Sequence, residues 1–340
     1  MFRQLAIAVC GVGATLCVTS CSNPVAPTPA TALAIACPAP PPTQSLDGKP
    51  VIVTYPLPVT SGGEGLITTT CTPPTSTPFP VGTTSVTCAA HDTHQHTATC
   101  VFPVSVTQVP RLSATRFLAF GDSMTAGVIA TSCRNGGPPT GLRWLDDLAL
   151  LRLDESPGRS YPSVLANLLA QRYNTQSFTM VNEGQSGETA TDGAMRFPKV
   201  LASTLPEVVL LLEGVNDINS LHADGIPGVV TSLRWMIRAA RQRGATVLVS
   251  TLLPQRRGAC RADGVDDIIP ANQQLRPMVS AEGAVLVDLS PQFEPNTTTW
   301  LGLDGLHPSE TGYAAMAQGF LDAIRGKLEQ QPSMFSRLPQ

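Results

Sequence analysis

Five short apolar runs recur along the chain and alternate with longer segments of helical patterning. The apolar runs are Arg116–Phe120, Phe178–Asn182, Val208–Leu212, Thr246–Ser250 and Ala284–Asp288. The helical segments are Pro162–Tyr173, Gly193–Leu205, Gly228–Arg243, Val265–Glu282 (with a break expected near Pro270 or Pro277) and Ser309–Leu328. Strands that are almost wholly apolar are buried on both faces, and regular alternation with helices is typical of a parallel sheet. The pattern predicts an α/β domain in which helices cover both sides of a parallel sheet.

The first apolar run leads into Gly121, Asp122 and Ser123, where a strand would pass into a helix. Open α/β sheets place their ligands at the carboxyl ends of parallel strands, so Ser123 is a candidate nucleophile. The alternative is that Ser123 only caps the segment that follows. A serine hydroxyl is a weak nucleophile unless a neighbouring base takes its proton.

The candidate base lies near the other end of the domain. His307 follows Asp304 by three residues, and on a short loop this spacing lets a carboxylate orient an imidazole. The other histidine in this part of the chain is His222. It has only Asp224 as a nearby acid, and we regard it as the weaker candidate.

Two further stretches, Asn182–Gly187 and Glu213–Asp217, each follow an apolar run. Together with Gly121–Ser123 and Asp304–His307, they resemble the four ordered blocks of the SGNH (GDSL) hydrolase family. The resemblance covers residues 113–328 and implies a three-layer, flavodoxin-like domain with five strands. It implies an esterase or lipase that requires no metal and no organic cofactor.

The resemblance also implies roles for individual residues. Ser123 would attack an ester carbonyl, His307 would transfer the proton, and Asp304 would orient His307. The backbone N–H groups of Ser123 and Gly184 and the side-chain amide of Asn216 would form the oxyanion hole.

Two neighbouring residues complete this interpretation. Glu183 precedes Gly184 where the family often has an apolar or small residue. Asp217, directly after Asn216, is expected to cap a loop or helix rather than to act as a second catalyst.

Residues 1–20 have the pattern of a bacterial signal peptide. Val18–Cys21 resembles a lipobox, so Cys21 would become the lipidated first residue and anchor the protein to a membrane. Ser22 resembles the signal that directs lipoproteins to an outer membrane. The alternative is an ordinary secretory signal. Residues 22–42 contain seven prolines and are expected to be an extended linker.

Six cysteines remain outside the signal peptide and the lipidation site, an even number that fits three disulfides in an oxidising compartment. We expect Cys133 to pair with Cys260, and sequence alone leaves three pairings open for the other four. Free buried thiols are the alternative, and none of the spacings indicates a zinc site. The six are Cys37, Cys71, Cys88, Cys100, Cys133 and Cys260.

Residues 43–108 are rich in Thr, Val and Pro and carry few charges, which favours a small β-sandwich. The segment Cys71–Cys88 resembles the hyalin-repeat (HYR) module, which implies an immunoglobulin-like fold and an adhesion or spacer role. Its partner would be a surface or matrix component. The expected strands are Val51–Tyr55, Gly65–Cys71, Thr84–Cys88 and Thr97–Val106.

This region contains three histidines within six residues, and imidazole side chains can bind transition metals. They are His91, His94 and His96. We favour a solvated hairpin tip, so no metal site is expected. The net charge of −3 gives no basis for a nucleic-acid partner.

The sequence thus predicts an exported serine hydrolase of the cell envelope: an outer-membrane lipoprotein, or a periplasmic or cell-surface protein. Its substrate would be a short-chain acyl or lysophospholipid ester, or an acetylated saccharide. Apolar residues around Trp144, in the insertion 131–160, would line the acyl site or pack on the core. The alternative function is a surface adhesion or binding lipoprotein with a silent hydrolase-like domain. The expected divisions are signal peptide 1–20, lipidated cysteine and linker 21–42, β-module 43–110, hydrolase domain 111–330 and tail 331–340.

Overall fold

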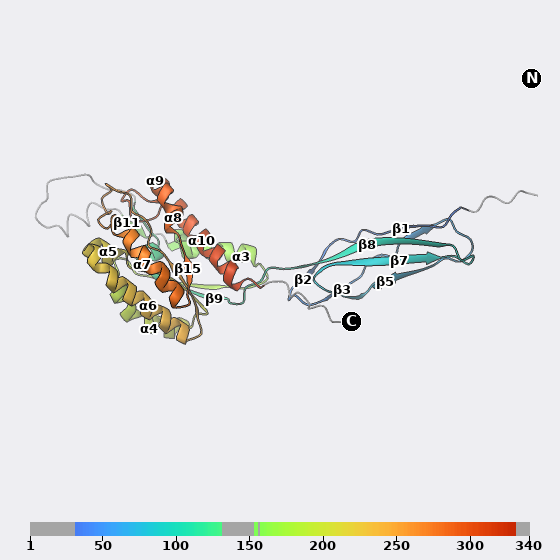
Figure 1. Ribbon diagram of the computed structural model, residues 1–340, viewed down its shortest axis with the longest axis horizontal. Coiled ribbons are helices and arrows are strands. Elements are labelled where there is room, and N and C mark those ends of the chain that lie inside the picture. Colours follow the sequence, from blue (N-terminus) through green and yellow to red (C-terminus); the bar gives the residue numbers. More distant parts are fainter. Residues whose placement is uncertain (1–30, 131–152, 156, 331–340) are drawn as a thin grey trace, which may run out of the picture. The chain divides into compact units, whose positions relative to one another are not determined.

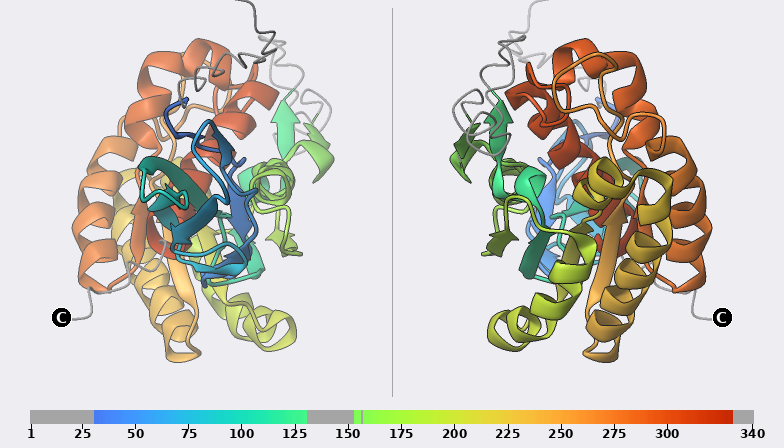
Figure 2. Two further views of the ribbon diagram at one scale, coloured as in Figure 1. Left: turned by 90° about the vertical axis from the view of Figure 1, so that its right-hand side faces the viewer. Right: turned by 90° about the vertical axis from the view of Figure 1, so that its left-hand side faces the viewer.

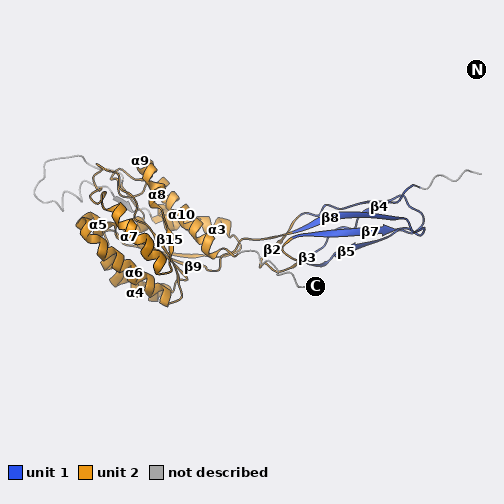
Figure 3. Cartoon of the chain, viewed as in Figure 1, with its two compact units in different colours: residues 1–41, 52–79, 83–105 blue, residues 42–51, 80–82, 106–340 orange. Residues whose placement is uncertain are grey.

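The computed structural model describes residues 31–130, 153–155 and 157–330. Contacts divide the chain into two compact units, coloured separately in Figure 3. Within the described ranges, no helix combines the length and the apolar character needed to cross a membrane. Several predicted features lie outside the described residues: the signal peptide, Cys21, residues 22–30 of the linker, Cys133, Trp144 and the C-terminal tail.

The larger unit is built on a five-stranded parallel sheet with the strand order β12-β9-β13-β14-β15. Each predicted apolar run forms one of these strands, which confirms the predicted parallel sheet. β13 is buried along its whole length, as its uninterrupted apolar sequence requires. The strands are β9 (Arg116–Gly121), β12 (Thr179–Gly184), β13 (Val208–Leu212), β14 (Thr246–Ser250) and β15 (Val285–Val287).

Helices cover both faces of this sheet (Figures 1 and 2). On one face α3 packs against α10, and on the other α6 packs against both α4 and α7. In α6 the apolar side chains recur at helical spacing and are buried, from Val229 and Leu233 to Ala240. These helices are α3 (Tyr161–Arg172), α4 (Ala190–Thr204), α6 (Ile226–Gln242), α7 (Ile268–Ala281) and α10 (Glu310–Leu328).

The break expected in the fourth helical segment is wrong. Helix α7 begins at Ile268, so Pro270 falls in its first turn, where a missing N–H costs no helical hydrogen bond. Pro277 lies inside the helix without ending it, between the buried side chains of Leu275 and Met278.

Shorter elements lie in the connections of the larger unit. β10 (Val128–Ala130) pairs with β11 (Leu153–Glu155) in an antiparallel ribbon. The others are α1 (Ser123–Ala126), η1 (Pro157–Arg159), α5 (Val215–Leu221), η2 (His222–Gly225), α8 (Ser290–Phe293), η3 (Glu294–Asn296) and α9 (Thr297–Trp300).

The described residues before 109 form β-strands. One sheet has the order β2-β8-β7-β5, and two further pairs are β3-β6 and β1-β4. All four predicted strands are present, while the immunoglobulin-like fold and the HYR assignment stay predictions. The strands are β1 (Ala34–Ala36), β2 (Thr43–Ser45), β3 (Val51–Val53), β4 (Val59–Ser61), β5 (Thr68–Thr72), β6 (Thr77–Phe79), β7 (Gly82–His91) and β8 (Thr97–Gln108).

The segment expected to be a linker differs from the prediction at its C-terminal end. β1 lies within it and pairs with β4, and Cys37 forms a disulfide with Cys100. Prolines flank these residues but do not interrupt them, so the short Ala34–Ala36 run is free to pair. The folded part therefore begins earlier than the proline content indicates.

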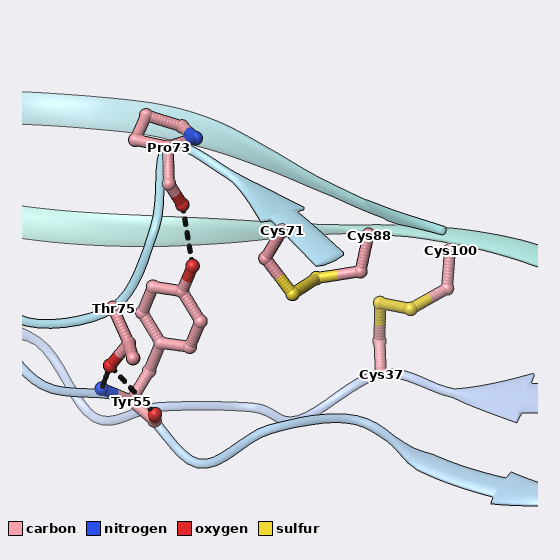
Figure 4. Close-up of a disulfide and its surroundings, with 7 residues drawn as sticks. All are labelled: Cys37, Tyr55, Cys71, Pro73, Thr75, Cys88 and Cys100. Atoms are coloured by element: carbon pink, nitrogen blue, oxygen red, sulfur yellow. Dashed lines mark hydrogen bonds between the residues drawn. A yellow bond between two sulfur atoms is a disulfide. The ribbon is translucent and has the colours of Figure 1, made fainter. Parts of the chain in front are cut away.

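Two disulfides lie in this β-strand region (Figure 4). Cys37 bonds to Cys100 and Cys71 bonds to Cys88, which selects one of the three pairings left open by the sequence. Nearby, the buried Tyr55 ring makes edge contacts with Phe79 and Phe102, and its hydroxyl donates to the backbone oxygen of Pro73 at 2.5 Å. The two bridges and this aromatic cluster stabilise the β-strand region.

Candidate active site

Ser123 lies at the carboxyl end of β9, the first strand of the parallel sheet. The chain passes from β9 to β12 on one side and afterwards to β13 on the other, so the strand order reverses here. Ligands of doubly wound sheets bind at such a reversal. Ser123 begins the short helix α1, and Asp122 caps it by accepting the N–H of Met124 at 2.9 Å.

His307 connects Ser123 to Asp304. Its Nε2 lies 2.9 Å from the Oγ of Ser123, and its Nδ1 lies 2.5 Å from an Oδ of Asp304. The exposed fractions are 5% for Ser123, 2% for His307 and 0% for Asp304. The structure thus brings together the three residues that the sequence singles out, in the order hydroxyl, imidazole, carboxylate. This arrangement suits proton transfer from the hydroxyl to the imidazole.

The other carboxylate oxygen of Asp304 accepts two backbone N–H groups, those of Leu306 and His307, each at 3.1 Å. Burial alone would raise the pKa of Asp304. The hydrogen bond and charge of His307, together with these two N–H groups, outweigh burial and lower it. Asp304 is therefore held as a carboxylate facing the imidazole.

Arg256 holds the loop that carries these two residues, a contact that sequence reasoning missed. Its guanidinium donates to the backbone oxygens of Gly302 and Leu303 at 2.8 and 2.9 Å, and to those of Thr297 and Leu301 at 3.2 and 3.4 Å. No sequence motif marks this arginine, because its four acceptors are backbone carbonyls of any residue type.

Two of the candidate oxyanion donors already have hydrogen-bond partners in the structure. The Nδ2 of Asn216 donates to the backbone oxygen of Glu188 at 2.8 Å, and a primary amide has a second proton to offer. The N–H of Gly184 donates to the side-chain oxygen of Asn182 at 3.0 Å. To donate to an oxyanion, the Gly184 N–H has to break its hydrogen bond to Asn182. Its assignment stays a prediction.

Gly187, the second glycine of the same block, was not singled out by the sequence. It has a φ of 81°, a left-handed conformation that favours glycine, and it directly precedes Glu188. The backbone oxygen of Glu188 accepts from the side-chain amide of Asn216, so Gly187 directly precedes the residue that binds this proposed oxyanion donor. The signal in the sequence is its place within Asn182–Gly187.

Carboxyl groups are concentrated beneath the site. Burial, reinforced by the nearby charges of Glu188 and Asp217, raises the pKa of Asp122 to about 7. Burial also raises the pKa of Glu213 well above its ordinary value, with Asp122 as the next cause. Asp217 accepts the N–H of Ala190, the first residue of α4, at 2.8 Å, in line with its predicted capping role.

Three other histidines, considered as a rival base or as metal ligands, have side-chain partners other than Ser123. His222 lies 3.5 Å from Asp267 with a largely exposed side chain, whereas Ser123 is bonded by His307. In the β-strand region, His96 bonds to the buried Asp92 at 2.9 Å and His94 pairs with Glu64 at 3.2 Å. Within the described ranges, no group of three or more His, Cys, Asp or Glu residues is arranged to hold a metal ion.

Cys260 is disulfide-bonded. Its predicted partner, Cys133, lies outside the described residues, so this pairing stays a prediction.

Comparison with known proteins places these features in a family. A model of the GDSL-like lipase/acylhydrolase family matches residues 119–315. An arylesterase of Vibrio mimicus is 31% identical over 154 residues, which are 44% of this chain and 70% of that protein.

Solved structures of other proteins also resemble the chain, and two of them serve as examples. The lipase/acylhydrolase of Enterococcus faecalis has a TM-score of 0.50 and 21% identity, covering 65% of this chain and 99% of its own. The inhibitor-bound aryl esterase of M. smegmatis has a TM-score of 0.47 and 19% identity, covering 63% and 99%. At this identity the Enterococcus structure shows a shared fold.

Proposed function

Because the chain belongs to the GDSL-like lipase/acylhydrolase family, we propose that it hydrolyses carboxylic esters through Ser123, His307 and Asp304. The observation that carries this proposal is the continuous hydrogen-bonded series from Ser123 Oγ through the His307 ring to Asp304. Those residues are buried at the carboxyl end of the sheet, where a substrate carbonyl would be removed from bulk water.

In the proposed reaction, the Oγ of Ser123 attacks the carbonyl carbon while its proton passes to Nε2 of His307. The tetrahedral intermediate collapses, the ester C–O bond breaks, and His307 returns the proton to the leaving alcohol. Water then attacks the acyl-enzyme by the same route and releases the acid. Asp304 holds the imidazole orientation and stabilises its charged form.

The oxyanion of this intermediate needs preorganised donors. We propose the N–H of Ser123, the Nδ2 of Asn216, and one N–H from the turn of residues 184–187. Gly184 is the donor implied by the family resemblance. Gly187 is the alternative, because the Gly184 N–H already has a partner in Asn182. Loss of one such donor costs about 3–4 kcal/mol of transition-state stabilisation.

Short-chain acyl esters are the proposed substrates. The Vibrio mimicus relative is an arylesterase, which supports an ester with an aryl leaving group. Acetylated saccharides and lysophospholipids are the competing substrates. They differ from simple aryl esters in leaving group and in chain length, so one substrate series separates them.

The test is hydrolysis of p-nitrophenyl esters from acetate to palmitate by purified residues 22–340 and by Ser123→Ala. We expect activity highest on short chains and abolished in the folded variant. Activity rising with chain length would favour a lipid substrate. Turnover equal to the wild type in Ser123→Ala would refute the catalytic assignment. A folded wild-type protein without activity on any ester would favour the adhesion or binding role.

We further propose that the protein is exported and anchored through a lipid on Cys21. The two disulfides of the β-strand region support an oxidising compartment. Cys21→Ser is expected to move the protein from the membrane fraction to the soluble fraction. Its retention on membranes would contradict a lipid anchor at this residue.

A further inference from the structure

Arg196, in helix α4, lies outside the four sequence blocks but bonds to both ends of the turn 184–187. Before the turn, its Nη2 donates to the backbone oxygen of Glu183 at 3.0 Å. After the turn, its Nε and Nη2 donate to the two carboxylate oxygens of Glu188 at 2.8 and 2.6 Å. Its Nη1 pairs with the carboxylate of Glu183 at 3.2 Å. One planar, rigid fork therefore fixes the entry and the exit of this turn.

The residue that follows this turn, Glu188, also holds Asn216. The backbone oxygen of Glu188 accepts one proton of the Asn216 amide, which leaves the amide's second proton in a defined direction. Gly184 and Gly187, the two alternatives for the third donor, both lie within the turn. Every proposed oxyanion donor except the N–H of Ser123 thus depends on the position of a segment that Arg196 fixes.

Arg196 also contacts the strand that carries Ser123. Its guanidinium carbon lies 4.2 Å from the centre of the Phe120 ring, in a cation–π arrangement. Phe120 belongs to β9 and packs edge-on against Phe197, the residue after Arg196. The arginine is thereby held between the nucleophile strand and the turn.

The charges around Arg196 explain why a permanent cation occupies this position. Glu188 and Glu213 are buried, with 4% and 1% of their surface exposed, and Asp122 is fully buried. Carboxyl groups gathered in a low-dielectric region repel one another when ionised. Arginine stays protonated at all relevant pH values and binds a carboxylate through two parallel bonds, which lysine and neutral side chains do not achieve.

We propose that Arg196 is a positioning residue that fixes the oxyanion hole by fastening the turn 184–187 at both ends. This inference rests on the proposed ester hydrolysis and adds to it a residue that none of the four sequence blocks contains.

The test compares Arg196→Met, Arg196→Lys and a matched control. The control is Arg172→Met, because Arg172 also makes a partly buried bidentate pair, with Glu329 at 3.0 and 2.9 Å. We expect Arg196→Met to lower kcat about 10- to 100-fold, since a small misplacement of catalytic donors has effects of this size. KM should change little. Arg196→Lys should recover part of the rate, and Arg172→Met should lower stability alone.

A double-mutant cycle tests the route of the effect. If Arg196 acts through the turn, Asn216→Ala already removes part of what Arg196 positions. The combined loss in Arg196→Met with Asn216→Ala should then be smaller than the product of the two single losses. A loss equal to that product would place the effect of Arg196 elsewhere and overturn the proposal.

Hydrogen exchange of the backbone amides from Gly184 to Gly187 gives a readout that needs no turnover. Exchange should be faster in folded Arg196→Met than in the wild type and in Arg172→Met. Wild-type kcat or unchanged exchange in Arg196→Met would each overturn the proposal. If the hydrolase assignment itself is wrong, the wild type will be no more active than Ser123→Ala. In that case the hydrogen-exchange result alone shows whether Arg196 holds the turn.

Discussion

The Nε2 of His307 lies 2.9 Å from the Oγ of Ser123, although 184 residues separate them in the chain. The two residues are brought together because β9 and the loop before α10 both end at the same edge of the parallel sheet. Asp304 completes the arrangement from the same loop.

Asp304→Asn should reduce kcat on p-nitrophenyl acetate about 10⁴-fold without unfolding the protein. An amide at this position can donate to Nδ1 of His307, which leaves the proton on Nε2 and prevents that nitrogen from accepting the proton of Ser123. Steady-state kinetics measures kcat, and circular dichroism shows whether the variant is folded. Asp224→Asn, beside His222, is the control and should keep full activity. A larger loss in the control than in Asp304→Asn would favour His222 as the base.

The donor in the turn 184–187 can be identified from its amide proton. When a phosphonate forms a tetrahedral adduct on Ser123, the amide proton that binds its oxygen should move strongly downfield in a ¹⁵N-resolved NMR spectrum. We expect the shift at Gly187, because the N–H of Gly184 is bonded to Asn182 in the free protein. A downfield shift at Gly184 instead would show that Asn182 is displaced and that the family-based assignment holds.

Asp122→Asn should remove a pH dependence from the stability of the protein. The folded carboxyl has a pKa raised to about 7, while its ordinary value is 3.8, so between these values the folded state binds more protons than the unfolded state. The free energy of unfolding then falls as pH rises through this window and levels off above about pH 7, with a slope of at most about 1.4 kcal/mol per pH unit from this group.

Urea unfolding of both proteins at pH 4, 5.5 and 7 measures this effect. Asparagine keeps the oxygen that accepts the N–H of Met124, so the helix cap survives the change. The variant should gain stability relative to the wild type as pH rises. Parallel pH profiles for the two proteins would mean that the carboxyl of Asp122 is not protonated in the folded state.

The two disulfides of the β-strand region should differ in their effect on stability. The Cys37–Cys100 bridge spans 63 residues and the Cys71–Cys88 bridge spans 17. On the loop-entropy model, replacing the first pair with serine should cost about 4 kcal/mol, and replacing the second about 3 kcal/mol. Denaturant unfolding of the two double variants measures the order. The reverse order would mean that the unfolded region retains structure.

Non-reducing peptide mapping decides the remaining bridge. Cys260 is disulfide-bonded, and Cys133 is its predicted partner. A linked Cys133–Cys260 peptide is expected, and a free thiol at Cys133 would refute the pairing.

The sequence by itself determined the strand positions of the larger unit and the residues of the candidate triad. Both follow from local patterns. Short apolar runs that alternate with helical segments indicate the strands of a parallel sheet, and Asp304 lies close enough to His307 in the chain to face it on one loop. The direction of the sheet and the position of Ser123 at its carboxyl end follow from the alternation of strands and helices.

Only the tertiary structure decided which distant groups meet. The pairing of Cys37 with Cys100, the strand at Ala34–Ala36, and the continuous helix through Pro277 depend on packing between segments remote in the chain. The same holds for Arg196 and Arg256. Their acceptors include backbone oxygens, which carry no residue-specific signal, so only the folded chain shows what these two arginines hold.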